Sequence, residues 1–90
     1  MRLRETEEKM NARGVRDPEV MYKVAEAYAV LGNQEAALRM LQRSTVGGFF
    51  CYPYIVRDPL LKVLRSSPGF QHLLEQARQR QQQFEQRFSR

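Results

Sequence analysis

Apolar residues recur at intervals of three and four along most of the chain, which is the spacing of one face of an α-helix. Over residues 18–31 this apolar stripe consists of Met21, Val24, Ala25, Tyr28 and Leu31. A second stripe consists of Ala37, Leu38, Leu41 and Thr45. Gly32 can end the first helix in a left-handed conformation, and Asn33 can cap the second. The pattern therefore predicts two helices that turn back on each other as an antiparallel hairpin.

Three dipeptides that end in proline indicate where helices begin. Asp17, Asp58 and Ser67 each precede a proline. An Asp or Ser oxygen can accept from the free N–H groups of a first turn, and proline there forfeits no hydrogen bond. We therefore expect a helix from Pro18, a short helix over residues 59–65 and a long helix from residue 68 to about residue 88.

Other helix signals are weaker. Residues 1–14 predict a weak N-terminal helix, because Glu5 and Lys9 form a favourable pair at i, i+4 but apolar residues are few. A glycine follows a helical run in three places, where a left-handed residue would end the helix. These glycines are Gly14, Gly32 and Gly47.

The stretch from residue 46 to residue 57 is rich in aromatic residues, which are Phe49, Phe50, Tyr52 and Tyr54. This composition suits a strand, but Pro53 interrupts it and no second strand is evident to pair with it. We expect an ordered loop that its aromatic side chains hold against neighbouring helices. The predicted fold is therefore all-α, with a hairpin over residues 18–45, the aromatic loop over 46–57 and capping helices over 58–90.

Length and composition limit the classes of protein that the chain can belong to. Ninety residues make one small domain with a thin hydrophobic core. No apolar run approaches the roughly 20 residues that span a bilayer, so we expect no membrane association. The N-terminal residues lack the apolar stretch of a secretion signal, and one cysteine, Cys51, excludes an internal disulfide. These features favour a cytoplasmic protein.

The hairpin carries the positions that define a known repeat. Small residues at Ala25 and Ala37 stand where two helix axes approach closely, and Tyr28 and Leu41 stand where large side chains fill the space between them. Gly32 stands between the helices. In this register the residues from Pro18 to Cys51 resemble a tetratricopeptide repeat, a helix–turn–helix unit of about 34 residues. The resemblance implies that Met21, Val24, Ala25, Tyr28, Ala37 and Leu41 form the core of the hairpin.

The sequence departs from the repeat pattern after the hairpin. The closing proline of the repeat would fall at Phe49, but the aromatic segment intervenes. This segment and the Asp-Pro-Leu-Leu stretch from Asp58 resemble the closing part of bacterial repeat arrays, such as those at the C-terminal end of protein kinases and winged-helix regulators. The resemblance implies a non-catalytic protein–protein interaction module, TPR-like, that caps a repeat array in a larger signalling protein.

Catalytic and metal-binding groups are sparse. His72 has Glu75 one helical turn away, but no nucleophile is placed near them. Cys51 lies between aromatic residues, so we expect it to be a small buried apolar residue. One histidine and one cysteine make a poor ligand set for zinc, which takes three or four ligands. We expect no enzyme activity and no cofactor.

The resemblance implies a concave groove for a protein or peptide partner. The positions that face it are Glu19, Tyr22, Glu26, Ala29 and Val30. Repeats that clamp a C-terminal carboxylate use Lys and Asn at such positions, whereas Glu and Tyr here favour a basic or apolar ligand. A solvated helix face that binds nothing is the alternative.

The net charge of +5 raises the alternative of a small basic helical nucleic-acid-binding domain. The charge is concentrated in residues 46–90, which hold seven basic and three acidic side chains against eight and seven in residues 1–45. Arg78 and Arg80 are two residues apart and so point away from each other on a helix. No recognition-helix pattern accompanies them, so nucleic acid is the less favoured partner.

The long C-terminal helix also predicts a surface for self-association. Phe70, Ala77 and Phe84 are seven residues apart, as are Leu74, Gln81 and Phe88. Phe84 lies about two helical turns beyond Ala77, so it extends past the part that can pack on the hairpin. A homodimer, docking onto a neighbouring domain, and a helix that folds back to bury Phe84 and Phe88 are all consistent with this pattern.

Overall fold

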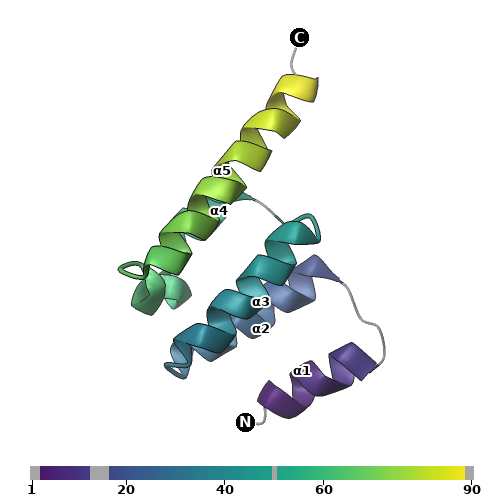
Figure 1. The fold of residues 1–90 in the computed structure, drawn as a ribbon, viewed down its shortest axis with the longest axis vertical. Coiled ribbons are helices and arrows are strands. Elements are labelled where there is room, and N and C mark those ends of the chain that lie inside the picture. The colour runs from purple at the N-terminus through teal and green to yellow at the C-terminus, as the bar shows by residue number, and fades with distance from the viewer. Residues whose placement is uncertain (1–2, 13–16, 50, 89–90) are drawn as a thin grey trace.

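A computed structural model describes residues 3–12, 17–49 and 51–88 of the chain. Its elements are α1 (Leu3–Ala12), α2 (Pro18–Val30), α3 (Gln34–Val46), α4 (Tyr52–Arg57), the 3₁₀ helix η1 (Pro59–Leu64) and α5 (Pro68–Phe88). The described residues form helices and no strands, which confirms the all-α prediction (Figure 1).

The predicted hairpin is formed by α2 and α3, which lie side by side (Figure 1). Ala25 and Ala37 are fully buried, because each lets the neighbouring helix approach closely. The other expected core residues are also buried, namely Met21, Val24, Tyr28 and Leu41. At the open end of the hairpin the buried Ser44 hydroxyl donates to the Pro18 carbonyl oxygen at 2.7 Å. The hydrophobic core of the domain is built around this pair.

Both helices of the hairpin end in the same backbone motif. After α2, Gly32 N–H donates to Ala29 and Asn33 N–H donates to Tyr28, at 3.0 and 2.9 Å. Gly32 has the left-handed φ of +83° that this pair of hydrogen bonds requires. The side-chain oxygen of Asn33 then caps α3 by accepting from the Ala36 N–H at 3.2 Å. One residue thus closes the first helix and opens the second.

The same motif at the end of α3 corrects one prediction. Gly47 was expected to be the left-handed residue, but its φ is −74° and Gly48 has the positive φ of +121°. Gly48 N–H donates to Thr45, and Phe49 N–H donates to Ser44. The helix runs to Val46, one residue further than predicted, so the turn moves along the chain by one position. Gly14, the third such glycine, lies outside the described residues.

The predicted helix starts are confirmed. The Asp17 side chain accepts from Glu19 N–H, and the Asp58 side chain accepts from Leu60 N–H, both at 2.9 Å. α5 begins at Pro68 as expected. The element after Asp58 is a 3₁₀ helix, η1, where a short α-helix was expected, and its buried Leu61 and Leu64 face the rest of the domain.

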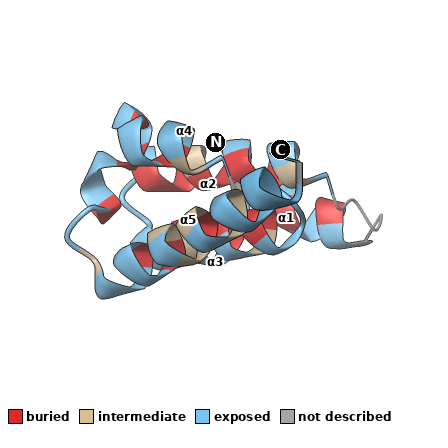
Figure 2. Cartoon of the chain, turned by 90° about the horizontal axis from the view of Figure 1, so that it is seen from above, coloured by how far each residue is buried: buried red, intermediate tan, exposed pale blue. Residues whose placement is uncertain are grey.

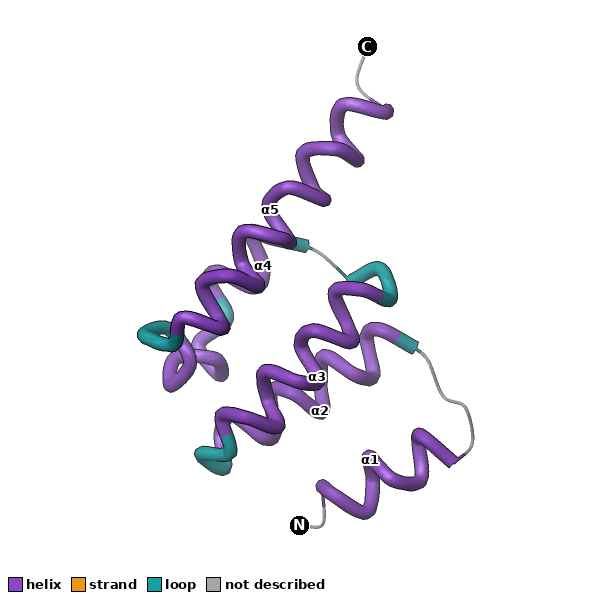
Figure 3. The backbone as a smooth tube through the Cα atoms, in the orientation of Figure 1, coloured by secondary structure: helices purple, strands orange, loops and turns teal. Residues whose placement is uncertain are grey.

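The aromatic segment is only partly a loop. Residues 52–57 form the helix α4 where a loop was predicted (Figure 3). Pro53 does not interrupt the segment, because it stands in the first turn of α4, where a missing N–H costs nothing. Ile55 of this helix is buried in the core. The domain therefore gains a short helix that packs on α5.

The two terminal helices lie on opposite sides of the hairpin in Figure 1. The first part of α5 is anchored by its buried Phe70, Leu73 and Ala77, and Figure 2 shows buried positions along this helix. Its second part extends beyond the other helices (Figure 1). The expected weak N-terminal helix is present as α1, which packs on α2 through the buried Met10.

A buried acid holds α1 in place. Glu7 accepts from the Tyr28 hydroxyl at 2.9 Å and from two guanidinium nitrogens of Arg39, at 2.8 and 3.1 Å. The hydrogen bonds from Arg39 lower the pKa of Glu7, although burial acts in the opposite direction. The bidentate pair with Arg39 joins α1 to α3, and the bond from Tyr28 joins α1 to α2.

We expect Ala37→Leu to lower the free energy of unfolding by about 1–3 kcal/mol, because no space remains for a larger side chain between α2 and α3. Chemical denaturation followed by circular dichroism measures the change. Gln42→Leu, at an exposed position of the same helix, is the matched control and should change stability little. An Ala37→Leu protein as stable as the wild type would contradict the close helix contact.

Candidate functional site

The central polar contact of the molecule joins α2 to the start of η1. The hydroxyl of Tyr22 donates to Oδ2 of Asp58 at 2.6 Å, and both residues are buried. The second carboxylate oxygen of Asp58 accepts from the Leu60 N–H at 2.9 Å. Burial and the bond to Asp58 raise the pKa of Tyr22, so this hydroxyl stays protonated and remains a donor.

Glu26 completes a pair of carboxyl groups at this contact. It lies one helical turn after Tyr22, and its carboxyl group and that of Asp58 influence each other's pKa. Burial and the neighbouring Asp58 raise the pKa of Glu26 to about 7, while Lys23 acts weakly in the opposite direction. Burial alone would raise the pKa of Asp58, but hydrogen bonds from Glu26, Tyr22 and the Leu60 amide outweigh it and lower the pKa. At neutral pH the pair therefore holds a proton on Glu26 part of the time.

Three aromatic rings cluster beside the two carboxyl groups. The ring centroids of Tyr22 and Phe49 are 4.6 Å apart, and those of Tyr22 and Tyr54 are 5.7 Å apart. Phe49 and Tyr54 meet edge to face at 6.3 Å. Tyr22 is almost entirely buried, whereas Tyr54 is 53 % exposed. The cluster thus runs from the core to the surface.

These groups surround a cavity of about 300 Å³ between α2 and the segment that leads into α4. Its lining residues are Glu19, Tyr22, Lys23, Glu26, Phe49, Cys51 and Tyr54. Three of the five residues that the resemblance placed in a groove, Glu19, Tyr22 and Glu26, are therefore brought together here. Ala29 is buried at 3 % exposure and Val30 is 63 % exposed, and neither lines this cavity.

Sequence reasoning missed half of this site. Asp58 was interpreted only as a helix cap, and Phe49 and Tyr54 only as contacts that hold a loop in place. Cys51 was expected to be buried, but it is exposed, because it precedes the first turn of α4 at the surface. Cys51 and Tyr54 line this cavity and also a second one, of about 410 Å³.

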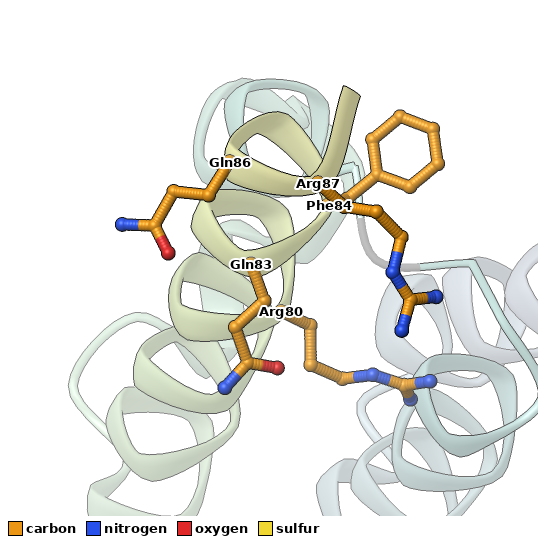
Figure 4. Close-up of a pocket in the computed structure, with 5 residues that line it drawn as sticks. All are labelled: Arg80, Gln83, Phe84, Gln86 and Arg87. Carbon is orange, nitrogen blue, oxygen red and sulfur yellow. The ribbon is translucent and has the colours of Figure 1, made fainter. Parts of the chain in front are cut away.

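A second surface lies along the projecting part of α5 (Figure 4). A hollow of about 740 Å³ is lined by Arg80, Gln83, Phe84, Gln86 and Arg87. The Arg80 guanidinium donates to the Thr45 carbonyl oxygen near the end of α3. Phe84 is 52 % exposed, so the helix does not fold back to bury it. The side chain of Phe88, the other residue predicted for self-association, lies outside the described part of the chain.

His72 and Glu75, the two residues considered for catalysis, do not line the cavity beside α2. His72 is exposed on α5. Its expected partner Glu75 instead accepts two hydrogen bonds from Arg78, and these bonds lower the pKa of Glu75. Within the described ranges, no three His, Cys, Asp or Glu side chains gather as ligands for a metal ion.

Comparisons with known proteins add no assignment. No protein-family model matches the chain, and neither the curated proteins nor the solved structures yielded a match. The resemblance to a tetratricopeptide repeat therefore remains a prediction from the residues. Of the helices that the structure describes, none is long and apolar enough to cross a membrane.

The raised pKa of Glu26 makes the stability of the domain depend on pH. The folded state holds the proton more tightly than the unfolded state, so the free energy of unfolding should fall as pH rises from about 4.5 to about 7. We expect a loss of about 1–2 kcal/mol from this group, because solvent reaches part of the carboxyl. Urea denaturation at a series of pH values measures it.

Glu26→Gln separates this effect from other titrations, because an amide donates to Asp58 without ionising. In this variant the free energy of unfolding should no longer fall between pH 4.5 and pH 7. Glu19→Gln, an exposed change on the same helix, should keep the wild-type profile. A Glu26→Gln profile that still follows the wild type would show that the two carboxyl groups do not share a proton.

Tyr22→Phe tests the bond between α2 and η1. The substitution removes the hydroxyl that donates to the buried Asp58 carboxylate, and we expect it to lower the free energy of unfolding by about 1–3 kcal/mol. Tyr54→Phe removes a hydroxyl from the half-exposed ring of the same cluster and serves as the matched control in thermal denaturation. Equal effects of the two substitutions would contradict the central role of the Tyr22–Asp58 bond.

Proposed function

We propose that this chain is a non-catalytic protein–protein interaction module, TPR-like in its hairpin, that binds a protein or peptide through the cavity beside α2. The observation that supports the proposal most directly is the lining of that cavity. Glu19 and Glu26 come from the helix whose positions face the groove in tetratricopeptide repeats, and Tyr54 adds an exposed ring from α4.

The composition of the cavity fits a binding surface. Aromatic residues that are anchored at one end and exposed at the other supply much of the energy of protein interfaces, because they bury a large area at a small loss of conformational freedom. Tyr54 contacts Tyr22 and Phe49 along its inner edge and is open to solvent elsewhere. The adjacent carboxyl groups give the surface a defined charge.

The wider setting follows from the residue pattern. We propose that the module forms the C-terminal part of a larger bacterial signalling or regulatory protein in the cytoplasm. Its single unpaired cysteine fits that compartment, because thiols stay reduced there. A single hairpin buries too little surface for a stable repeat array, and the first part of α5 covers one face of it. Phe84 is 52 % exposed on the projecting part of α5, and we propose that this part of the helix docks on a second copy or on a neighbouring domain.

Nucleic-acid binding is the alternative, and the charges of α5 weigh against it. Arg78 is paired with Glu75, and Arg80 donates to the carbonyl oxygen of Thr45. Basic side chains that bind phosphate are usually gathered on one open face, where they release counterions together. Here two of them are engaged by groups of the protein itself.

Selection of random peptides displayed on phage tests the proposed interaction. We expect peptides that bind the wild-type protein and bind Tyr54→Ala at least about tenfold more weakly, as for loss of an aromatic anchor. Fluorescence anisotropy with the individual peptides measures the dissociation constants. Phe84→Ala, which removes an exposed ring far along α5, is the matched control and should leave these constants unchanged.

Two results would overturn the assignment to this cavity. Peptides that lose affinity for Phe84→Ala but not for Tyr54→Ala would place the binding surface on α5. A failure to select any peptide, together with salt-dependent binding of a fluorescent DNA duplex, would favour the nucleic-acid alternative.

A further inference from the structure

The cavity beside α2 combines ring surfaces with acidic side chains, and this combination selects the charge of a ligand. Glu19 and Glu26 are two helical turns apart on the same face of α2, and both line the cavity. Phe49 and Tyr54 border the same space. A cation is attracted both by the faces of aromatic rings and by carboxylates, whereas an anion would be repelled by both.

We propose that this cavity binds the guanidinium group of an arginine side chain in a peptide partner, with the aromatic rings beside its plane and the α2 carboxylates opposite its charge. The inference rests on the interaction function proposed above and specifies its ligand. A volume of about 300 Å³ is at the lower limit for ligand cavities and suits one side chain of a partner. A guanidinium group is planar and weakly hydrated, so it can stack on Tyr54 and pair with a carboxylate at once.

One cation of the chain already lies at the rim. Lys23 also lines the cavity, and it stands between Glu19 and Glu26 along α2. Its ammonium group attracts the Glu26 carboxylate, so it competes with an incoming guanidinium for the same charge. Removal of Lys23 should therefore strengthen binding, whereas removal of a residue that merely shapes the cavity would weaken it.

The surroundings of Glu26 couple binding to pH. Its pKa is changed by Asp58 at the start of η1 and by Lys23 on its own helix, and Glu26 in turn raises the pKa of Tyr22 and of Tyr54 on α4. Asp58 is itself bound by Tyr22 and lies near Arg65. Because the pKa of Glu26 is about 7, the carboxyl must often release a proton before it can pair with a guanidinium. Affinity should therefore rise with pH through this range.

An NMR titration of the full chain with N-acetyl-arginine amide tests the proposal. The neutral and nearly isosteric N-acetyl-citrulline amide is the matched ligand control. We expect the arginine probe to shift the ring signals of Tyr22, Phe49 and Tyr54 and to bind about threefold to tenfold more tightly than citrulline. Its affinity should rise by up to about tenfold between pH 6 and pH 8, while that of citrulline should stay constant.

Variants distinguish a specific site from general attraction to an acidic surface. Glu26→Gln should reduce arginine binding to the level of citrulline and abolish its pH dependence, and Lys23→Met should tighten it. Glu75→Gln makes the same charge change on α5 and should have no effect. Equal affinity for the two probes, no binding of arginine up to its solubility limit, or unchanged binding by Glu26→Gln would each overturn the proposal.

The test of arginine binding can fail or succeed independently of the test of peptide binding. Selected peptides that depend on Tyr54 but contain no arginine would leave the interaction function standing and would overturn the inference about its ligand. Arginine-specific shifts at the cavity, in the absence of any selected peptide, would support the cation site and contradict the wider peptide-binding function.

Discussion

The buried carboxylate of Asp58 ties the helical hairpin to the part of the chain that follows it. It caps η1 through the Leu60 N–H and accepts from the Tyr22 hydroxyl on α2, and the carboxyl of Glu26 helps to lower its pKa. A buried carboxylate is costly unless it is fully hydrogen-bonded, so these partners fix one another's positions. The position of α4, and with it the place of Tyr54 at the surface, follows from this contact because α4 ends directly at Asp58.

A second buried acid, Glu7, also joins separate helices through its hydrogen bonds. Glu7 joins α1 to Tyr28 of α2 and Arg39 of α3, so a helix with few apolar residues still has a fixed place. In a domain this small the apolar core alone is thin, and polar contacts between elements contribute a larger share of the specificity.

The chemistry of that cavity arises from this arrangement and not from any motif. Glu19 and Glu26 could be assigned to one face of α2 from their spacing, but the rings that meet them come from residues beyond the hairpin. Phe49 reaches the cavity because Gly48 turns the chain at the end of α3, and Tyr54 reaches it because it lies on the helix α4, whose first turn contains Pro53. A pair of acidic residues on a helix thereby becomes part of an aromatic-lined site.

Local sequence determined the helices, their caps and the hairpin, because those features depend on residues within one or two turns of each other. Asp17, Asn33 and Asp58 each bond to an amide two or three residues away, and such signals can be interpreted directly. A loop was predicted in place of α4 because Pro53 interrupts the aromatic segment as a strand, whereas the structure has Pro53 in the first turn of a helix that packs on α5. The bond from Tyr22 to Asp58 spans 36 positions, so no local pattern could indicate it. Tertiary structure alone decided the candidate site, because it brought together side chains whose separation along the chain carries no information about their distance in space.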